Sequence, residues 1–134
     1  MSGEVINFKQ NKLLYPELSY KINGVMFEVY KQLGPGHHEK YYQKAIAIGF
    51  KNIGLKYEEQ YYVPLKMDGE IVGKYFLDFL VEGKIIVEIK RGKLLPFKNI
   101  QQTKQYLSAL NLKLAIIVSF TYDGAIINRV LNEY

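Results

Sequence analysis

The segment 76–90 constrains the fold more than any other part of the chain, because it places charged residues among apolar, strand-forming ones. Its pattern is typical of a β-hairpin, with Glu82-Gly83-Lys84 as the loop between two strands. When Gly83 takes the left-handed position of this loop, Val81 pairs with Ile85. The segment therefore predicts two antiparallel, largely buried strands.

The same register brings two acids together. Counting outward from the loop places Asp78 directly opposite Glu88, and Lys90 shares the face of Glu88 because it lies two residues further along the strand. Facing carboxylates repel each other in a half-buried place unless a cation or a shared proton relieves them. Oxygen ligands favour Mg²⁺ or Mn²⁺, and a lysine beside them can stabilise a transferring phosphoryl group. The pattern indicates phosphodiester hydrolysis, and a solvated charged cluster on a sheet edge is the alternative.

Length and composition limit the class of protein. The chain has 134 residues, which is enough for a self-sufficient core, and we expect residues 1–134 to form a single domain. It has no cysteine, so disulfides and thiolate metal sites are excluded. No apolar run approaches the ~20 residues of a membrane span, and the first residues do not resemble a signal peptide. A soluble cytoplasmic protein with no membrane partner is the expectation.

Basic residues concentrate around the acidic motif. The net charge is +5, and the six basic side chains between residues 84 and 104, set against the single acid Glu88, account for the whole excess. Such a distribution favours a polyanionic partner. The partner we expect is nucleic acid, most simply DNA, and a lysine-rich solvated face is the alternative. The residues expected to contact it, apart from Lys90, are Lys84, Arg91, Lys93, Lys98 and Lys104.

Hydrophobic periodicity predicts the remaining elements. The expected helices cover residues 17–33, 37–49 and 96–110. The expected strands cover residues 57–66, 71–81, 85–90 and 113–120, the first three as an antiparallel meander whose first turn contains Asp-Gly. The tail from residue 125 fits either a helix or a strand.

Polar residues stand on or beside the apolar faces of two expected helices. Glu39 precedes Tyr42 by three residues and so faces inward with it, which is unusual unless the acid is paired or binds a metal. A helix-start acid that favours the helix dipole is the alternative. Gln102 and Tyr106 lie one turn apart and border the apolar face of the helix 96–110.

The chain resembles the core of the PD-(D/E)xK nuclease superfamily over residues 19–127, with Asp78 and Glu88-Ile89-Lys90 on its second and third strands. The stretch from Gly36 to Tyr42 fits the GxxExxY signature of one small family of that superfamily, and Gln102 with Tyr106 matches the Gln-x-x-x-Tyr element of its RecB-like branch. The resemblance implies an α/β (α+β), restriction-endonuclease-like fold of order αβββαβ, with a central mixed sheet flanked by helices.

The resemblance also implies roles for individual residues. The implied metal ligands, for Mg²⁺ or Mn²⁺, are Asp78, Glu88, the Ile89 carbonyl and Glu39, the last directly or through water. Lys90 would orient the attacking water and stabilise the transition state, while Gln102 and Tyr106 would hold a substrate phosphate or a water. His37 and His38 fill variable positions of the signature, and we expect them to be exposed at the helix start.

The activity implied by the resemblance is that of a metal-dependent nuclease that hydrolyses DNA. The alternative is a catalytically silent module of the same fold that binds nucleic acid or a protein partner, although the acids and the lysine are all present here. A homodimer that uses Tyr57, Tyr61 and Tyr62 is a further alternative, with packing within the strand as the simpler use of these residues. At Phe76 the chain departs from the family, in which a basic residue is common at this position.

Overall fold

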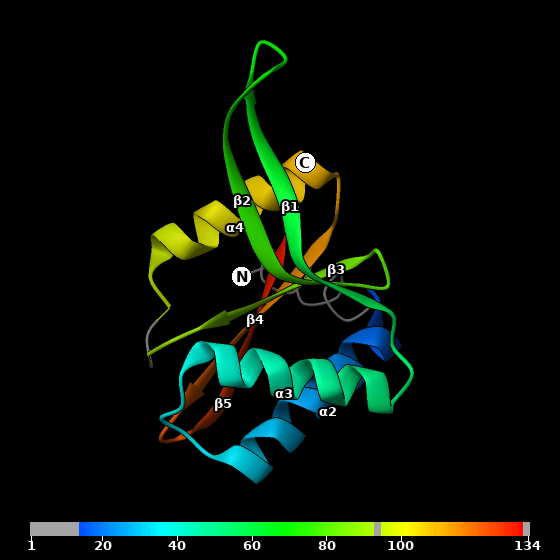
Figure 1. The fold of residues 1–134 in the computed structure, drawn as a ribbon, viewed down its shortest axis with the longest axis vertical. Coiled ribbons are helices and arrows are strands. Elements are labelled where there is room, and N and C mark those ends of the chain that lie inside the picture. Colours follow the sequence, from blue (N-terminus) through cyan, green and yellow to red (C-terminus); the bar gives the residue numbers. More distant parts are fainter. Residues whose placement is uncertain (1–13, 93–94, 133–134) are drawn as a thin grey trace, which may run out of the picture.

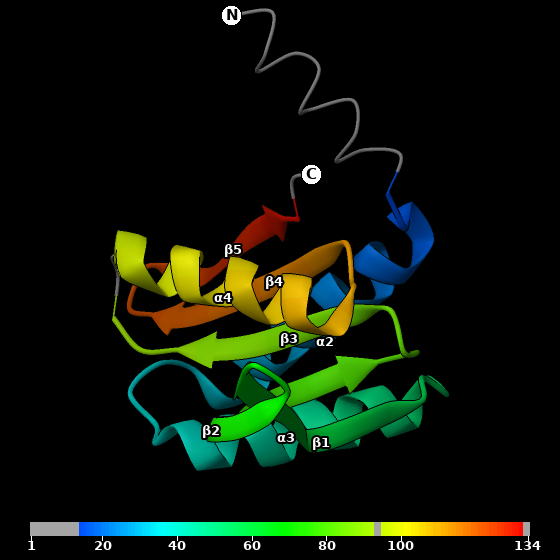
Figure 2. The same cartoon turned by 90° about the horizontal axis from the view of Figure 1, so that it is seen from above.

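The computed structural model describes residues 14–92 and 95–132, which form a five-stranded sheet with helices on both of its faces (Figures 1 and 2). The helices are α2 (Pro16–Leu33), α3 (Glu39–Asn52) and α4 (Phe97–Leu110). The strands, which lie in sequence order across the sheet, are β1 (Tyr57–Met67), β2 (Glu70–Val81), β3 (Ile85–Lys90), β4 (Leu114–Thr121) and β5 (Gly124–Leu131). Only β3 and β4 pair in parallel, and α4 connects them. The predicted central mixed sheet flanked by helices is confirmed.

The expected elements are present, with some ends shifted. Helix α3 begins at Glu39 rather than at residue 37, because the His38 ring accepts a hydrogen bond from the Lys40 N–H at 3.2 Å and so caps the helix. The helix also continues three residues beyond the predicted residue 49, to Asn52. The tail is strand β5, which pairs antiparallel with β4 over its whole length.

Both hairpin turns follow from their sequences. Asp68 and Gly69 take positive φ angles of 51° and 81°, as the Asp-Gly turn between β1 and β2 requires. Val81 pairs with Ile85 as expected, but positive φ is found at Glu82 as well as at Gly83. The register of β2 against β3 is therefore the predicted one.

The sheet separates two apolar cores. The core between the sheet and the helices α2 and α3 includes Ile22, Met26, Ile46, Phe50, Phe79, Val87, Ile89 and Ile116. The core beneath α4 includes Leu77, Leu80, Ile86, Tyr106, Leu107 and Ile117. Strand β4 is buried along its length, as its continuous apolar run predicts. Among the described helices, none is long and apolar enough to cross a membrane.

Strands β1 and β2 extend beyond the sheet as an arm. Strand β3 pairs with β2 only at residues 79–81, whereas β1 pairs with β2 out to the turn at Asp68. The end of this hairpin, around the turn, projects from the rest of the molecule in Figure 1, and residues 62–76 are here called the hairpin arm. Large apolar side chains near the end of the arm are exposed, among them Met67, Ile71 and Val72.

Candidate active site

Strands β2 and β3 separate at a fork, and the two acids lie there. The last paired residues are Phe79 and Val87, so Asp78 and Glu88 come next on the two strands. The Asp78 carboxylate accepts a hydrogen bond from the Ile89 N–H at 2.8 Å. The Asp78 carboxylate thus takes the place of a backbone carbonyl of β2 as the acceptor for this N–H. The bond matters because a buried N–H without a partner is costly. The side chain of Asp78 therefore also holds the fork together.

Glu88 is buried beside Asp78. Its side chain lies within strand β3 and is only 6% exposed. Burial, the negative charge of Asp78 and a hydrogen bond between the two side chains raise the pKa of Glu88 to about 9, while Lys90 opposes the rise. Without a cation, Glu88 is therefore protonated at neutral pH. Two carboxyl groups in this relation can share a proton or a hard metal ion, so the donor set suits Mg²⁺ or Mn²⁺.

A backbone irregularity on β1 faces the fork. Gln60 lies opposite Asp78 by register, but it has no partner in the β1–β2 ladder and takes a φ of 49°. Its side-chain amide donates to Oε1 of Gln43 on α3 at 3.0 Å. Leu77 and Leu80, three residues apart, both pack beneath α4, so the alternation of side chains along β2 is broken at Asp78. Sequence reasoning missed Gln60, because glutamine has no preference for this conformation.

Helix α4 brings Tyr106 close to the acids. Tyr106 is buried, with its ring centroid 5.0 Å from that of Tyr75 on β2. Burial and the charge of Glu88 raise the pKa of Tyr106 to about 12, so its hydroxyl stays protonated and can donate a hydrogen bond. Gln102 lies one turn earlier on α4 and is half-buried. The predicted tyrosine thus lies near the fork acids.

The start of α3 is held in place by Tyr42. Its hydroxyl donates to the Gly34 carbonyl at 2.6 Å and accepts from the His37 N–H at 3.2 Å. Its ring stacks on Phe120 of β4, with the centroids 4.2 Å apart. These contacts fix the loop before α3 against the end of β4, and so they position Glu39 at the first residue of the helix.

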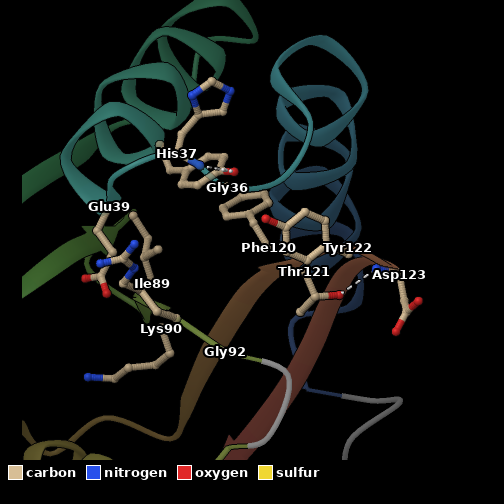
Figure 3. A pocket seen from close by; sticks show the side chains of 12 residues that line it. Gly36, His37, Glu39, Ile89, Lys90, Gly92, Phe120, Thr121, Tyr122 and Asp123 are labelled. Atoms are coloured by element: carbon tan, nitrogen blue, oxygen red, sulfur yellow. Dashed lines mark hydrogen bonds between the residues drawn. The ribbon is translucent and has the colours of Figure 1, made fainter.

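Glu39 lies in a pocket of about 400 Å³ at the ends of β3 and β4. Figure 3 shows Glu39 on the same side of this pocket as Ile89 and Lys90, with Tyr122 and Asp123 across from them. Gly36, which also lines this pocket, has a φ of 89° that suits glycine alone.

The pocket and the fork are adjacent but distinct. Ile89 lines the pocket and packs with α2 and α3, whereas its neighbour Glu88 points to the other face of β3 and does not line the pocket. Within residues 14–92 and 95–132, no three His, Asp or Glu side chains are close enough together to hold a metal ion. The structure thus brings Asp78 and Glu88 together without Glu39, and metal binding by Glu39 stays a prediction.

His37 and His38 make contacts at the ends of two helices. Both are exposed, as expected. His38 caps α3, and Nε2 of His37 lies 2.8 Å from the carbonyl oxygen of Leu33 at the end of α2.

The predicted basic residues are spread over the molecule. Arg91 lines the pocket, Lys98 is exposed in the first turn of α4, and Lys104 is half-buried further along that helix. Lys93 lies outside the described residues. Lys84 precedes β3 and so lies about 13 Å along the strand from Glu88. Its ammonium group is 5.9 Å from the centroid of the Tyr15 ring.

Comparison with known proteins gives one family and two similar structures. A family model described as PD-(D/E)XK nuclease superfamily matches residues 16–130. The structure titled "Crystal structure of SSO0001" has a TM-score of 0.54 and 18% identity, over 72% of this chain and 50% of that one. An alkaline exonuclease (LHK-Exo) from Laribacter hongkongensis has a TM-score of 0.52 and 15% identity, over 71% of this chain and 56% of that one.

The likeness to these two structures shows a common restriction-endonuclease-like fold. The chain spans about half the length of the two solved proteins. No curated protein matches the sequence.

Proposed function

This chain belongs to the PD-(D/E)XK nuclease superfamily, and we propose that it hydrolyses phosphodiester bonds of DNA at the fork between β2 and β3, with Mg²⁺ or Mn²⁺ as cofactor. The observation that carries the proposal is the contact of Asp78 with the buried Glu88, whose raised pKa expresses the need for a proton or a cation. The nuclease description of the family and the exonuclease among the similar structures support a nucleic-acid substrate.

Individual residues of the chain would have separate roles in this reaction. Asp78 and Glu88 would hold the metal together with the Ile89 carbonyl, and Glu39 would reach it through water from the adjacent pocket. A bound metal supplies an activated water and neutralises charge on the phosphate. Lys90, whose positive charge acts on Glu88, would stabilise the charge that develops on the phosphoryl oxygens.

Helix α4 would complete the site. The protonated hydroxyl of Tyr106 is a donor near Glu88, and it would bind a phosphate oxygen or a water. Gln102, on the same helix, would hold the same group from one turn away. Arg91 and Lys98 would contact neighbouring phosphates of the DNA strand.

The test is cleavage by the purified protein in Mg²⁺, Mn²⁺, Ca²⁺ and EDTA, with plasmid, linear duplex and single-stranded DNA as substrates. Lys90→Ala should slow cleavage about a hundredfold to a thousandfold, because it removes a group that acts on charge present only in the transition state. Mn²⁺ binding, measured by calorimetry, should survive this change.

Lys84→Ala is the matched control, since Lys84 is a lysine that directly precedes the other end of β3. Equal rates for wild type and Lys90→Ala would show that the proposed mechanism is wrong. Binding of DNA with no cleavage of any substrate would favour the silent binding module instead.

A further inference from the structure

The hairpin arm carries two exposed aromatic rings and a lysine close to the fork. Up to Leu77, alternation along β2 puts Lys74 and Phe76 on the side of the strand away from Tyr75 and Leu77, and Tyr62 on β1 pairs with Phe76. Tyr62 is 43% exposed and Phe76 is 50% exposed, with their ring centroids 5.7 Å apart. The Lys74 ammonium lies 5.9 Å from the centroid of the Phe76 ring. Tyr62, Lys74 and Phe76 are here called the arm cluster.

The other side of the arm explains why the cluster stays in place. Val63, Tyr75 and Leu77 alternate with the cluster residues and pack beneath α4, with Tyr75 in ring contact with Tyr106. One side of the arm is thus anchored in a core while the other presents uncovered rings. Exposed aromatic rings grouped in this way mark an interaction surface, because single soluble domains bury such area where they can.

We propose that the arm cluster binds unpaired bases, and therefore that the fork acts on single-stranded DNA or on single-stranded ends. This inference rests on the proposed nuclease function. Aromatic rings beside a cation form a stacking platform for successive bases, with the cation available to the backbone. Phe76 lies two residues from Asp78, about 7 Å along the strand. A base on the ring and a phosphate at the fork would thus belong to the same few nucleotides.

The chemistry of the cluster favours single strands over two other occupants. A duplex offers base edges in its grooves and keeps the faces of its bases stacked on one another, so it has no free face for Tyr62 or Phe76. A protein partner, including a second copy of this chain, would be better served by the aliphatic surface at Met67, Ile71 and Val72. The lysine over Phe76 adds the charge that a polyanion needs.

The test uses an oligothymidylate with one 2-aminopurine, bound in Ca²⁺ so that stacking is measured without cleavage. We expect wild type to quench the 2-aminopurine fluorescence and to prefer this strand to the matching duplex. Phe76→Ala and Tyr62→Ala should each weaken single-strand binding about tenfold or more. Phe76→Leu should weaken it as well, because leucine keeps apolar area but has no π-face.

Two further variants separate stacking from general effects. The chain has no tryptophan, so Phe76→Trp creates a single indole whose fluorescence should be quenched by the bound strand while affinity is kept. Phe27→Ala, at a phenylalanine on α2 that is 53% exposed, is the matched control and should bind as wild type does. Unchanged thermal unfolding of each variant shows that the fold is intact.

Equal single-strand affinity for wild type and Phe76→Leu would overturn the inference. So would loss of a dimer in Phe76→Ala without any change in DNA binding, since this would identify a homodimer surface. The two proposals fail separately. Stacking of the strand without cleavage in Mg²⁺ would contradict only the proposed nuclease function. Undiminished cleavage of single strands by Phe76→Leu would contradict only the proposed role of the arm cluster.

Discussion

The two halves of β2 differ in their surroundings. The inner half, residues 77–81, packs into both cores, and its last three residues pair with strands on both sides. The outer half, residues 70–76, pairs with β1 alone and is mostly exposed. Asp78 lies where the one changes into the other, beside the fully covered Glu88. A carboxylate at this boundary is held by a rigid sheet and is still open to a substrate, which neither half could provide by itself.

Asp78→Asn should have the largest effect. The asparagine oxygen can still accept from the Ile89 N–H, so the fork should keep its shape while the charge is lost. We expect calorimetry with Mn²⁺ to show no binding and cleavage to fall below detection. Asp68→Asn in the outer turn, where asparagine tolerates the positive φ, is the control. Mn²⁺ binding equal to that of wild type would exclude Asp78 as a ligand.

Two phenylalanines should separate the halves of β2 by stability. Phe79 is fully buried against Phe50, and Phe79→Ala should lower the free energy of unfolding by about 3–5 kcal/mol. Phe76→Ala in the outer half should change it by no more than about 0.5 kcal/mol. Urea unfolding measures both. Similar losses for the two variants would mean that the arm is part of the core and that the distinction between the halves does not hold.

The third prediction concerns pH and the metal-free protein. The raised pKa of Glu88 means that the folded state keeps a proton that the unfolded state loses above about pH 4.5. The free energy of unfolding should therefore fall as pH rises from about 5 to about 9, by up to about 1.4 kcal/mol per pH unit. Glu88→Gln should remove this slope, and saturating Mn²⁺ should reduce it.

The control for this measurement is Glu70→Gln, which changes an exposed acid at the start of the outer half. Its pH dependence should match that of wild type. A wild-type slope that Glu88→Gln leaves intact would show that the burial of Glu88 does not control stability in this range.

The smallest effect is expected in the salt dependence of DNA binding. Each phosphate contact on a single strand contributes about −0.7 to the slope of log K against log salt concentration. Lys98→Gln, at the exposed start of α4, should reduce the slope by about one contact, whereas Lys84→Gln should leave it unchanged. Fluorescence anisotropy at several KCl concentrations measures both. An equal reduction for Lys84→Gln would mean that DNA extends along the whole of β3.

The parts of the molecule that could be predicted from the sequence depend on local chemistry. The turn at Asp68-Gly69, the pairing of Val81 with Ile85 and the buried β4 each follow from residues close together in the chain. The same register places Asp78 opposite Glu88, which is why the centre of the candidate site could be found without a structure.

The parts that the sequence did not reveal depend on contacts between distant segments. The left-handed Gln60 is linked to Gln43 on another element. The position of Glu39 depends on the stacking of Tyr42 on Phe120, and it places the acid in a pocket beside the fork rather than among the fork acids. The exposed arm could not be predicted either, because its strands have the same apolar alternation as covered ones.

The hydrogen bond from the Ile89 N–H to Asp78 has a consequence for how such a chain can change over time. Under the proposed function, position 78 has two separate requirements, a negative charge for the metal and an acceptor that joins two strands. A relative of this chain without nuclease activity would still need the acceptor but not the charge. Asparagine could then replace the aspartate, because its side-chain oxygen also accepts a hydrogen bond. An aspartate at position 78 is therefore weaker evidence of catalytic activity than a lysine at position 90.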